Sequence, residues 1–149
     1  MRDYLLESVK RHEGYRSKAY RDLVGVWTIG YGTNLQVLEI DESLAAKWLK
    51  DKLDEACAIV AGWTWTEALN PARQDAIVEM VYNLGPEFGD GDGFKDWPLF
   101  VAQMQSGDYQ AAARNMLATL WARQVGKRAD RLAAQVATGK HWHELPEHV

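Results

Sequence analysis

The amino-acid sequence predicts a mainly helical α+β fold with a small β-hairpin lobe, a long connecting helix and a larger all-helical lobe. Two contrasting hydrophobic patterns indicate this division. Residues 15–32 combine aromatic and β-branched side chains with glycines, which is typical of short strands and tight turns. From Asp41 onward, apolar residues recur at helical spacing. The length of 149 residues, 47% of them hydrophobic, suits one soluble globular domain.

The first 62 residues supply the predicted small lobe and the connecting helix. A helix over residues 2–12 ends before Gly14. A hairpin turn then separates two strands, expected over residues 19–21 and 26–29. The connecting helix begins after Asp41 as its N-cap and ends before Gly62. Its length of about 30 Å, at 1.5 Å per residue, is enough to join two lobes.

The remaining sequence predicts the helical lobe. Asn70 and Pro71 are a strong helix start, and the apolar helix that they open runs to Gly85 as the buried centre of this lobe. Shorter helices are expected over residues 97–105, 108–118 and 127–138. We assign residues 1–149 to one domain, with the small lobe at about 14–60 and the helical lobe at about 63–149 plus helix 1–12.

Composition and charge argue against several kinds of protein. The net charge of −4 disfavours a nucleic-acid binder, although one local basic run could face an anionic polymer. That run consists of Arg114, Arg123, Lys127, Arg128 and Arg131, with Asp130 as its single acid. The sequence contains neither a signal peptide nor a stretch of about 18 apolar residues, so we expect cytoplasmic synthesis and no membrane insertion.

Cofactor and metal signals are weak. The single cysteine, Cys57, excludes an internal disulfide and is expected to be a small core residue. The segment Asp90-Gly91-Asp92-Gly93 begins like a calcium loop but lacks its later ligands. His141 and His143 lack the further ligands that a zinc site needs. We therefore expect no metal and no cofactor.

Two acids could share one reaction. Glu13 directly follows the first predicted helix at its C-terminal end, where the negative end of the helix dipole disfavours a charged carboxylate. Asp22 lies in the polar hairpin turn, where a charged carboxylate carries no such penalty. Glycosidic cleavage requires two acids with different protonation states, one protonating the leaving oxygen and one assisting at the anomeric carbon. The hydroxyl of Thr28, on the returning strand, could hold a water beside Asp22.

The spacing of Glu13, Asp22 and Thr28 within RHEGYRSKAYRDLVGVWTIGYGTN resembles the phage-type lysozymes, or endolysins, of glycoside hydrolase family 24, which include the T-even phage lysozyme. The segments NPARQDAIVEMVYNLG, GDYQAAARNM and WARQVGKRADR are similar to helices of that family, so the resemblance covers nearly the whole chain. It implies a bilobed, lysozyme-like fold in which Glu13 is the general acid. Asp22 would orient the attacking water, with Thr28 as its assistant.

The resemblance also implies roles for residues of the helical lobe. Tyr82 and Asn115 fall where the family contacts the glycan, and the neighbouring Asn83 is a further candidate. Arg128 falls where the family places an arginine against the catalytic glutamate. Trp97 replaces a small polar residue near the substrate, so it either adds a stacking surface or fills space.

Two departures from the family concern the small lobe. The passage from Asn34 to Asp41 is short, which predicts a shorter side to the cleft. Thr33 and Lys52 replace a histidine and an aspartate that pair across this lobe, so we expect no salt bridge there.

The resemblance implies an endo-β-N-acetylmuramidase that cleaves the bond between N-acetylmuramic acid and N-acetylglucosamine in peptidoglycan glycan strands, with inversion, during phage-mediated host lysis. A lytic transglycosylase, which can work with one glutamate, and a non-catalytic cell-wall-binding module are the alternatives. The protein is expected to be a monomer, made in the host bacterial cytoplasm and released to the cell wall with a holin. No nucleic-acid partner is expected.

Overall fold

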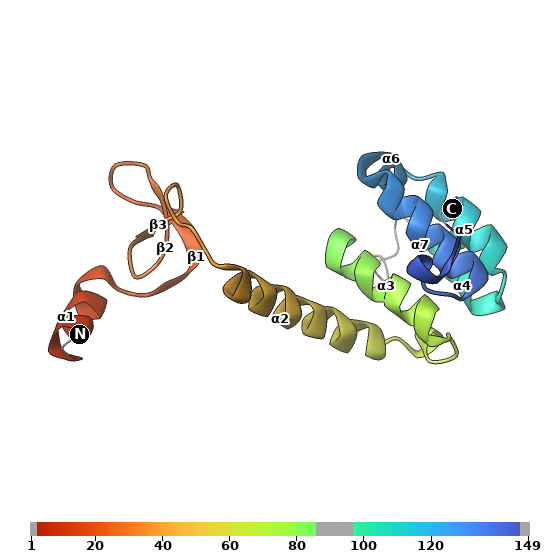
Figure 1. Ribbon diagram of the computed structural model, residues 1–149, viewed down its shortest axis with the longest axis horizontal. Helices are drawn as coiled ribbons and strands as arrows, with labels where there is room; N and C mark the ends of the chain where they lie inside the picture. The colour runs from red at the N-terminus through yellow and green to blue at the C-terminus, as the bar shows by residue number, and fades with distance from the viewer. Residues whose placement is uncertain (1–2, 86–96, 147–149) are drawn as a thin grey trace. The chain divides into compact units, whose positions relative to one another are not determined.

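The computed structural model describes residues 3–85 and 97–146 (Figure 1). Over these residues the fold is mainly helical with one small sheet, which confirms the predicted α+β class. The chain divides into two compact units, Met1–Ala46 and Lys47–Val149. In the part of the chain that the structure describes, no helix has the length and apolar character needed to cross a membrane.

The N-terminal unit consists of a helix followed by a three-stranded antiparallel sheet in the order β1-β2-β3. Thr28 lies on the central strand, opposite Tyr20 on one side and Asn34 on the other. The predicted hairpin is therefore confirmed, but its first strand begins earlier than expected and a third strand follows it. The elements are α1 (Asp3–Glu13), β1 (Arg16–Arg21), β2 (Trp27–Gly30) and β3 (Thr33–Asn34).

The long helix α2 (Glu42–Ala61) follows with its predicted cap. The Asp41 Oδ1 accepts a hydrogen bond from the Leu44 N–H at 2.8 Å, which satisfies a donor at the first turn. Ala56 and Val60 join the hydrophobic core of the C-terminal unit. The expectation that Cys57 is a core residue is wrong, because its side chain is exposed. One residue corresponds to about 100° around a helix, so Cys57 points away from the buried face marked by Ala56.

The C-terminal unit packs several helices around one core. Helix α7 lies against α3, α5 and α6, and α4 packs on α5 (Figure 1). Its helices are α3 (Pro71–Leu84), α4 (Pro98–Ser106), α5 (Tyr109–Leu117), α6 (Leu120–Val125) and α7 (Lys127–Thr138), with short 3₁₀ turns at Thr64–Thr66 and Trp142–Glu144. Among the residues that the structure describes, the largest fully buried side chains are Phe100, Ile77, Met80, Met104, Met116, Leu132 and Val136.

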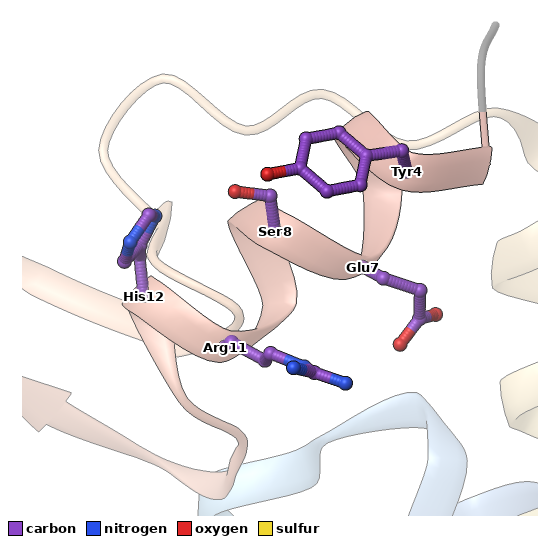
Figure 2. A pocket seen from close by; sticks show the side chains of 5 residues that line it. All are labelled: Tyr4, Glu7, Ser8, Arg11 and His12. Atoms are coloured by element: carbon purple, nitrogen blue, oxygen red, sulfur yellow. The ribbon is translucent and has the colours of Figure 1, made fainter.

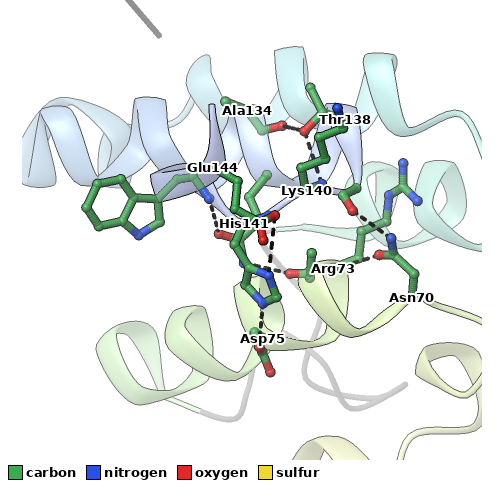
Figure 3. Close-up of polar contacts among 12 residues, drawn as sticks. Asn70, Arg73, Asp75, Ala134, Thr138, Lys140, His141 and Glu144 are labelled. Atoms are coloured by element: carbon green, nitrogen blue, oxygen red, sulfur yellow. Dashed lines mark hydrogen bonds and ion pairs between the residues drawn. The ribbon is translucent and has the colours of Figure 1, made fainter. Parts of the chain in front are cut away.

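Polar side chains join the start of α3 to the end of α7 (Figure 3). The Asn70 amide donates to the Gly139 carbonyl at 2.7 Å, and the Arg73 Nε–H donates to the Val136 carbonyl at 2.8 Å. These bonds satisfy carbonyls that have no partner within α7. The same joint includes a 2.8 Å contact between His141 Nε2 and Asp75 Oδ2.

Candidate active site

Glu13 is the last residue of α1, as predicted, and its carboxyl group lies against Gly32 in the turn between β2 and β3. A Cβ atom built at Gly32 would lie 2.9 Å from the Glu13 Cδ and closer still to its Oε2. The helix ends here because Gly14 takes a left-handed conformation, with its N–H donating to the Lys10 carbonyl at 3.0 Å. The end of α1 and the β2–β3 turn are thus in direct contact.

Two aromatic rings make a second contact between the same segments. Tyr15 and Tyr31 have ring centroids 5.4 Å apart, within the range of favourable aromatic pairs. Tyr15 follows the end of α1 and Tyr31 precedes Gly32. The pair therefore links the segment after α1 to the β2–β3 turn, beside the Glu13–Gly32 contact.

Asp22 organises the hairpin turn with one oxygen of its carboxylate. Its Oδ1 accepts hydrogen bonds from the Val24 N–H at 2.9 Å and from the Val26 N–H at 2.8 Å. The Asp22 N–H in turn donates to the Val26 carbonyl at 3.0 Å. Both of these side-chain hydrogen bonds are made by Oδ1, so this oxygen fixes the orientation of the carboxylate.

Thr28 is buried in the sheet, and its side chain also forms a hydrogen bond with Val26. Its Oγ1 donates to the Val26 carbonyl at 3.1 Å, and its exposed fraction is 4%. The Val26 carbonyl oxygen therefore accepts from both the Asp22 N–H and the Thr28 hydroxyl. This shared acceptor brings the Thr28 hydroxyl close to the start of the turn that holds Asp22.

Tyr82 and Arg128 line one hollow of about 370 Å³ within the C-terminal unit. Leu49 and Leu53 of α2 form part of its apolar wall. Arg128 forms an ion pair with Glu79, with 3.2 Å between Nε and Oε1. The pairing of Arg128 with Glu13, which belongs to the other unit, stays a prediction.

The other glycan-binding candidates have partners inside the C-terminal unit. The Asn83 Oδ1 accepts from the Trp121 indole N–H at 2.7 Å, and the Asn115 amide donates to the Gln103 Oε1 at 3.3 Å. Trp97 is 8% exposed and packs edge-on against Trp121, with centroids 5.9 Å apart. These contacts support the space-filling reading of Trp97, and its stacking on a glycan stays a prediction.

A separate hollow of about 190 Å³ lies on α1 (Figure 2). It is lined by Tyr4, Glu7, Ser8, Arg11 and His12. None of the three predicted catalytic residues lines it, so this hollow does not mark the predicted chemistry.

No group of three or more potential metal ligands comes together within residues 3–85 and 97–146. His141 instead contacts Asp75, and its ring stacks on His143 with centroids 5.5 Å apart. The segment Asp90-Gly91-Asp92-Gly93, which begins like a calcium loop, lies outside the described residues.

Comparison with known proteins gives a match to the family described as phage lysozyme over residues 10–137. The chain belongs to the phage lysozyme family. It is 32% identical over 123 residues to an endolysin of Acyrthosiphon pisum secondary endosymbiont phage 1, covering 80% of each chain. It is 30% identical over 132 residues to the endolysin of Salmonella phage P22, covering 83% of this chain and 84% of that protein.

The family match defines the general activity of the chain as that of a lysozyme-type hydrolase of phage origin that degrades peptidoglycan. All of the predicted site residues, from Glu13 to Arg128, fall inside the matched range. Two of their contacts escaped the sequence analysis. The glycines within residues 15–32 indicated tight turns without indicating that Glu13 lies against Gly32, and nothing in the sequence pointed to Glu79 as a partner of Arg128.

Proposed function

We propose that this phage lysozyme hydrolyses the β-1,4 bond between N-acetylmuramic acid and N-acetylglucosamine with inversion at the anomeric carbon. The observation that supports it is the common link of Asp22 and Thr28 to Val26, in the unit that also contains Glu13. An inverting glycosidase needs an acid for the leaving oxygen and a base that activates a water.

In this proposal Glu13 donates its proton to the glycosidic oxygen as the bond from that oxygen to the anomeric carbon breaks. A water attacks the opposite face of the sugar, and its oxygen forms the new bond to the anomeric carbon. The water gives up one proton to Asp22. Later exchange with solvent returns the proton to Glu13 and removes it from Asp22.

The hydrogen bonds of Asp22 and Thr28 suit them to hold that water. Oδ1 of Asp22 accepts from two backbone N–H groups, so Oδ2 is the oxygen assigned to accept a proton of the water. The Thr28 hydroxyl donates its hydrogen to Val26 and can accept the second hydrogen of the water with a lone pair. With both hydrogens held, a lone pair of the water faces the anomeric carbon.

We assign the helical lobe to binding and electrostatics. Tyr82 and Asn115 are proposed to contact the glycan, with Asn83 and Trp97 as further contacts. Arg128 is proposed to act on the charge of Glu13. We also propose that the protein acts as a monomer that is made in the host cytoplasm and released by a holin.

The products of a peptidoglycan digest test this proposal. Hydrolysis with inversion produces ordinary reducing ends that form first as the α-anomer, which nuclear magnetic resonance of early products resolves. A lytic transglycosylase would use the 6-hydroxyl of muramic acid as its internal nucleophile and leave 1,6-anhydro ends. A predominance of anhydro-muropeptides in mass spectra would contradict the roles given to Asp22 and Thr28. A protein that binds the cell wall and releases no product would contradict catalysis itself.

A further inference from the structure

We infer that Gly32 is a positioning residue, which sets the place of the Glu13 carboxyl group because it has no side chain. The inference rests on the proposed function, in which Glu13 is the general acid. It concerns how the sheet holds that acid, and it gives the β2–β3 turn a role in catalysis.

The contact between the two residues is direct. A Cβ at Gly32 would lie 2.9 Å from the Glu13 Cδ and 3.5 Å from its Cγ, and it would overlap the Oε2 atom. The carboxyl group therefore occupies the space that any side chain at position 32 would need. The Tyr15–Tyr31 pair holds the flanking segments together, so the turn cannot easily withdraw from the end of α1.

Gly30 provides a matched comparison two residues away. Both glycines have a left-handed backbone, with φ of 67° at Gly30 and 76° at Gly32. A Cβ at Gly30 would have no heavy atom within 4 Å. Alanine at either position thus introduces similar backbone strain, but only at position 32 does it meet the carboxyl group.

Alanine at position 32 should move the carboxyl group and leave the sheet in place. Glu13 is an exposed side chain at a helix end, so it can rotate away from a new methyl group. A general acid must lie within hydrogen-bond reach of the oxygen that it protonates. A displacement of about 1 Å from that geometry can lower the rate about 10²-fold.

The test compares Gly32→Ala with Gly30→Ala on soluble glycan fragments, with kcat and KM measured separately. We expect Gly32→Ala to lower kcat about 10²-fold with KM changed less than about 2-fold, whereas Gly30→Ala keeps kcat near that of the unmodified protein. Both should lower the melting temperature by similar amounts. If the alanine variants fold poorly, Gly32→Asn and Gly30→Asn carry the same comparison, because asparagine tolerates a left-handed backbone.

Glu13→Asp separates positioning from general damage to the turn. Its carboxyl group is one methylene shorter and withdraws from Gly32. Adding Gly32→Ala to the Glu13→Asp variant should therefore lower kcat less than about 3-fold. In the protein that keeps Glu13, the same substitution should lower kcat about 10²-fold. Equal costs on both backgrounds would contradict the inference.

Glu13→Gln, measured in parallel, distinguishes the two ways to fail. If it is inactive while Gly32→Ala keeps kcat at the level of Gly30→Ala, the inference about Gly32 is wrong and the role of Glu13 stands. If Glu13→Gln is active, the proposed function fails and the inference fails with it.

Discussion

The backbone of Val26 connects the two residues that the proposed mechanism places beside the water. Its N–H donates to the Asp22 carboxylate, and its carbonyl accepts from the Asp22 N–H and the Thr28 hydroxyl. Because all three bonds use backbone atoms of Val26, the side chain at position 26 can vary without breaking them. The geometry of Asp22 and Thr28 therefore depends on the hairpin being closed.

Substitution of Thr28 tests its assistance to the water. Thr28→Val removes the hydroxyl at nearly constant volume and should lower kcat about 10²-fold, toward the lower end of what a positioned proton-transfer group contributes. Thr28→Ser keeps the hydroxyl and should retain most of the activity. Steady-state rates on glycan fragments check this, with melting temperature as the control for folding. Equal kcat values for the valine and serine variants would exclude a role for the hydroxyl.

The sequence predicted the local positions of Glu13 and Asp22 better than it predicted their neighbours from other segments. Glu13 and Asp22 were predicted at a helix end and in a turn because helix-stop and turn signals are local, and the structure places them there. Their candidate roles came from the spacing motif. The Glu13–Gly32 contact joins two separate segments, and no local signal encodes it. Cys57 was misassigned to the core because its helix has neighbouring apolar residues that face different sides.

The helices and strands also differ in how well the sequence predicted them. The starts of α2 and α3 were predicted correctly, and there Asp41 and Asn70 each accept a hydrogen bond from a first-turn N–H. The helix α6 and the strand β3 were not predicted. Six residues and two residues, respectively, are too few for hydrophobic periodicity to be recognised.

The cap of α2 predicts how stability responds to acid. Hydrogen bonds from the Ser43 hydroxyl and the Leu44 N–H lower the pKa of Asp41 below its ordinary value. A lowered pKa in the folded state adds stability above the ordinary aspartate value of about 3.9, and this stability is lost as the pH falls through the folded-state value. The Asp41→Asn side chain still caps the helix but does not ionise, so that variant lacks the stability that comes from ionised Asp41.

Melting temperatures of the unmodified protein and Asp41→Asn, measured from pH 6 to pH 2, check that prediction. The unmodified protein should melt at the higher temperature at pH 6, and the difference should close below about pH 4. A difference that stays constant across this range would show that ionised Asp41 adds nothing to the cap.

The predicted chemistry is divided between the two units of the chain. The N-terminal unit carries Glu13, Asp22 and Thr28, and the C-terminal unit carries Tyr82 and Arg128 along one hollow. Patterns in the sequence can assign residues to each unit, but they do not show which side chains of one unit act with those of the other. The roles of Arg128 and Tyr82 were therefore taken from the family resemblance.

Two neutral variants distinguish the role of Arg128 in catalysis from that of its partner Glu79. Their side chains are 42% and 38% exposed, and ion pairs at that exposure contribute less than about 1 kcal/mol to the free energy of unfolding. We expect both Arg128→Gln and Glu79→Gln to fold almost as stably as the unmodified protein. Arg128→Gln should lower kcat, because it removes the charge assigned to act on Glu13, and Glu79→Gln should not. Equal losses of activity would mean that Arg128 acts through its pair with Glu79.

The proposed role of the Glu13 carboxyl group as the proton donor to the glycosidic oxygen is tested by Glu13→Gln. Glutamine has nearly the same shape and cannot act as this acid, and neutralising an exposed functional carboxylate should leave stability equal or higher. The measurement is the rate at which the purified variant clears a suspension of bacterial cell walls. We predict a loss of at least about 10²-fold with an unchanged or raised melting temperature. If the variant melts at the same temperature and clears the suspension at the rate of the unmodified protein, Glu13 is not the acid of the reaction.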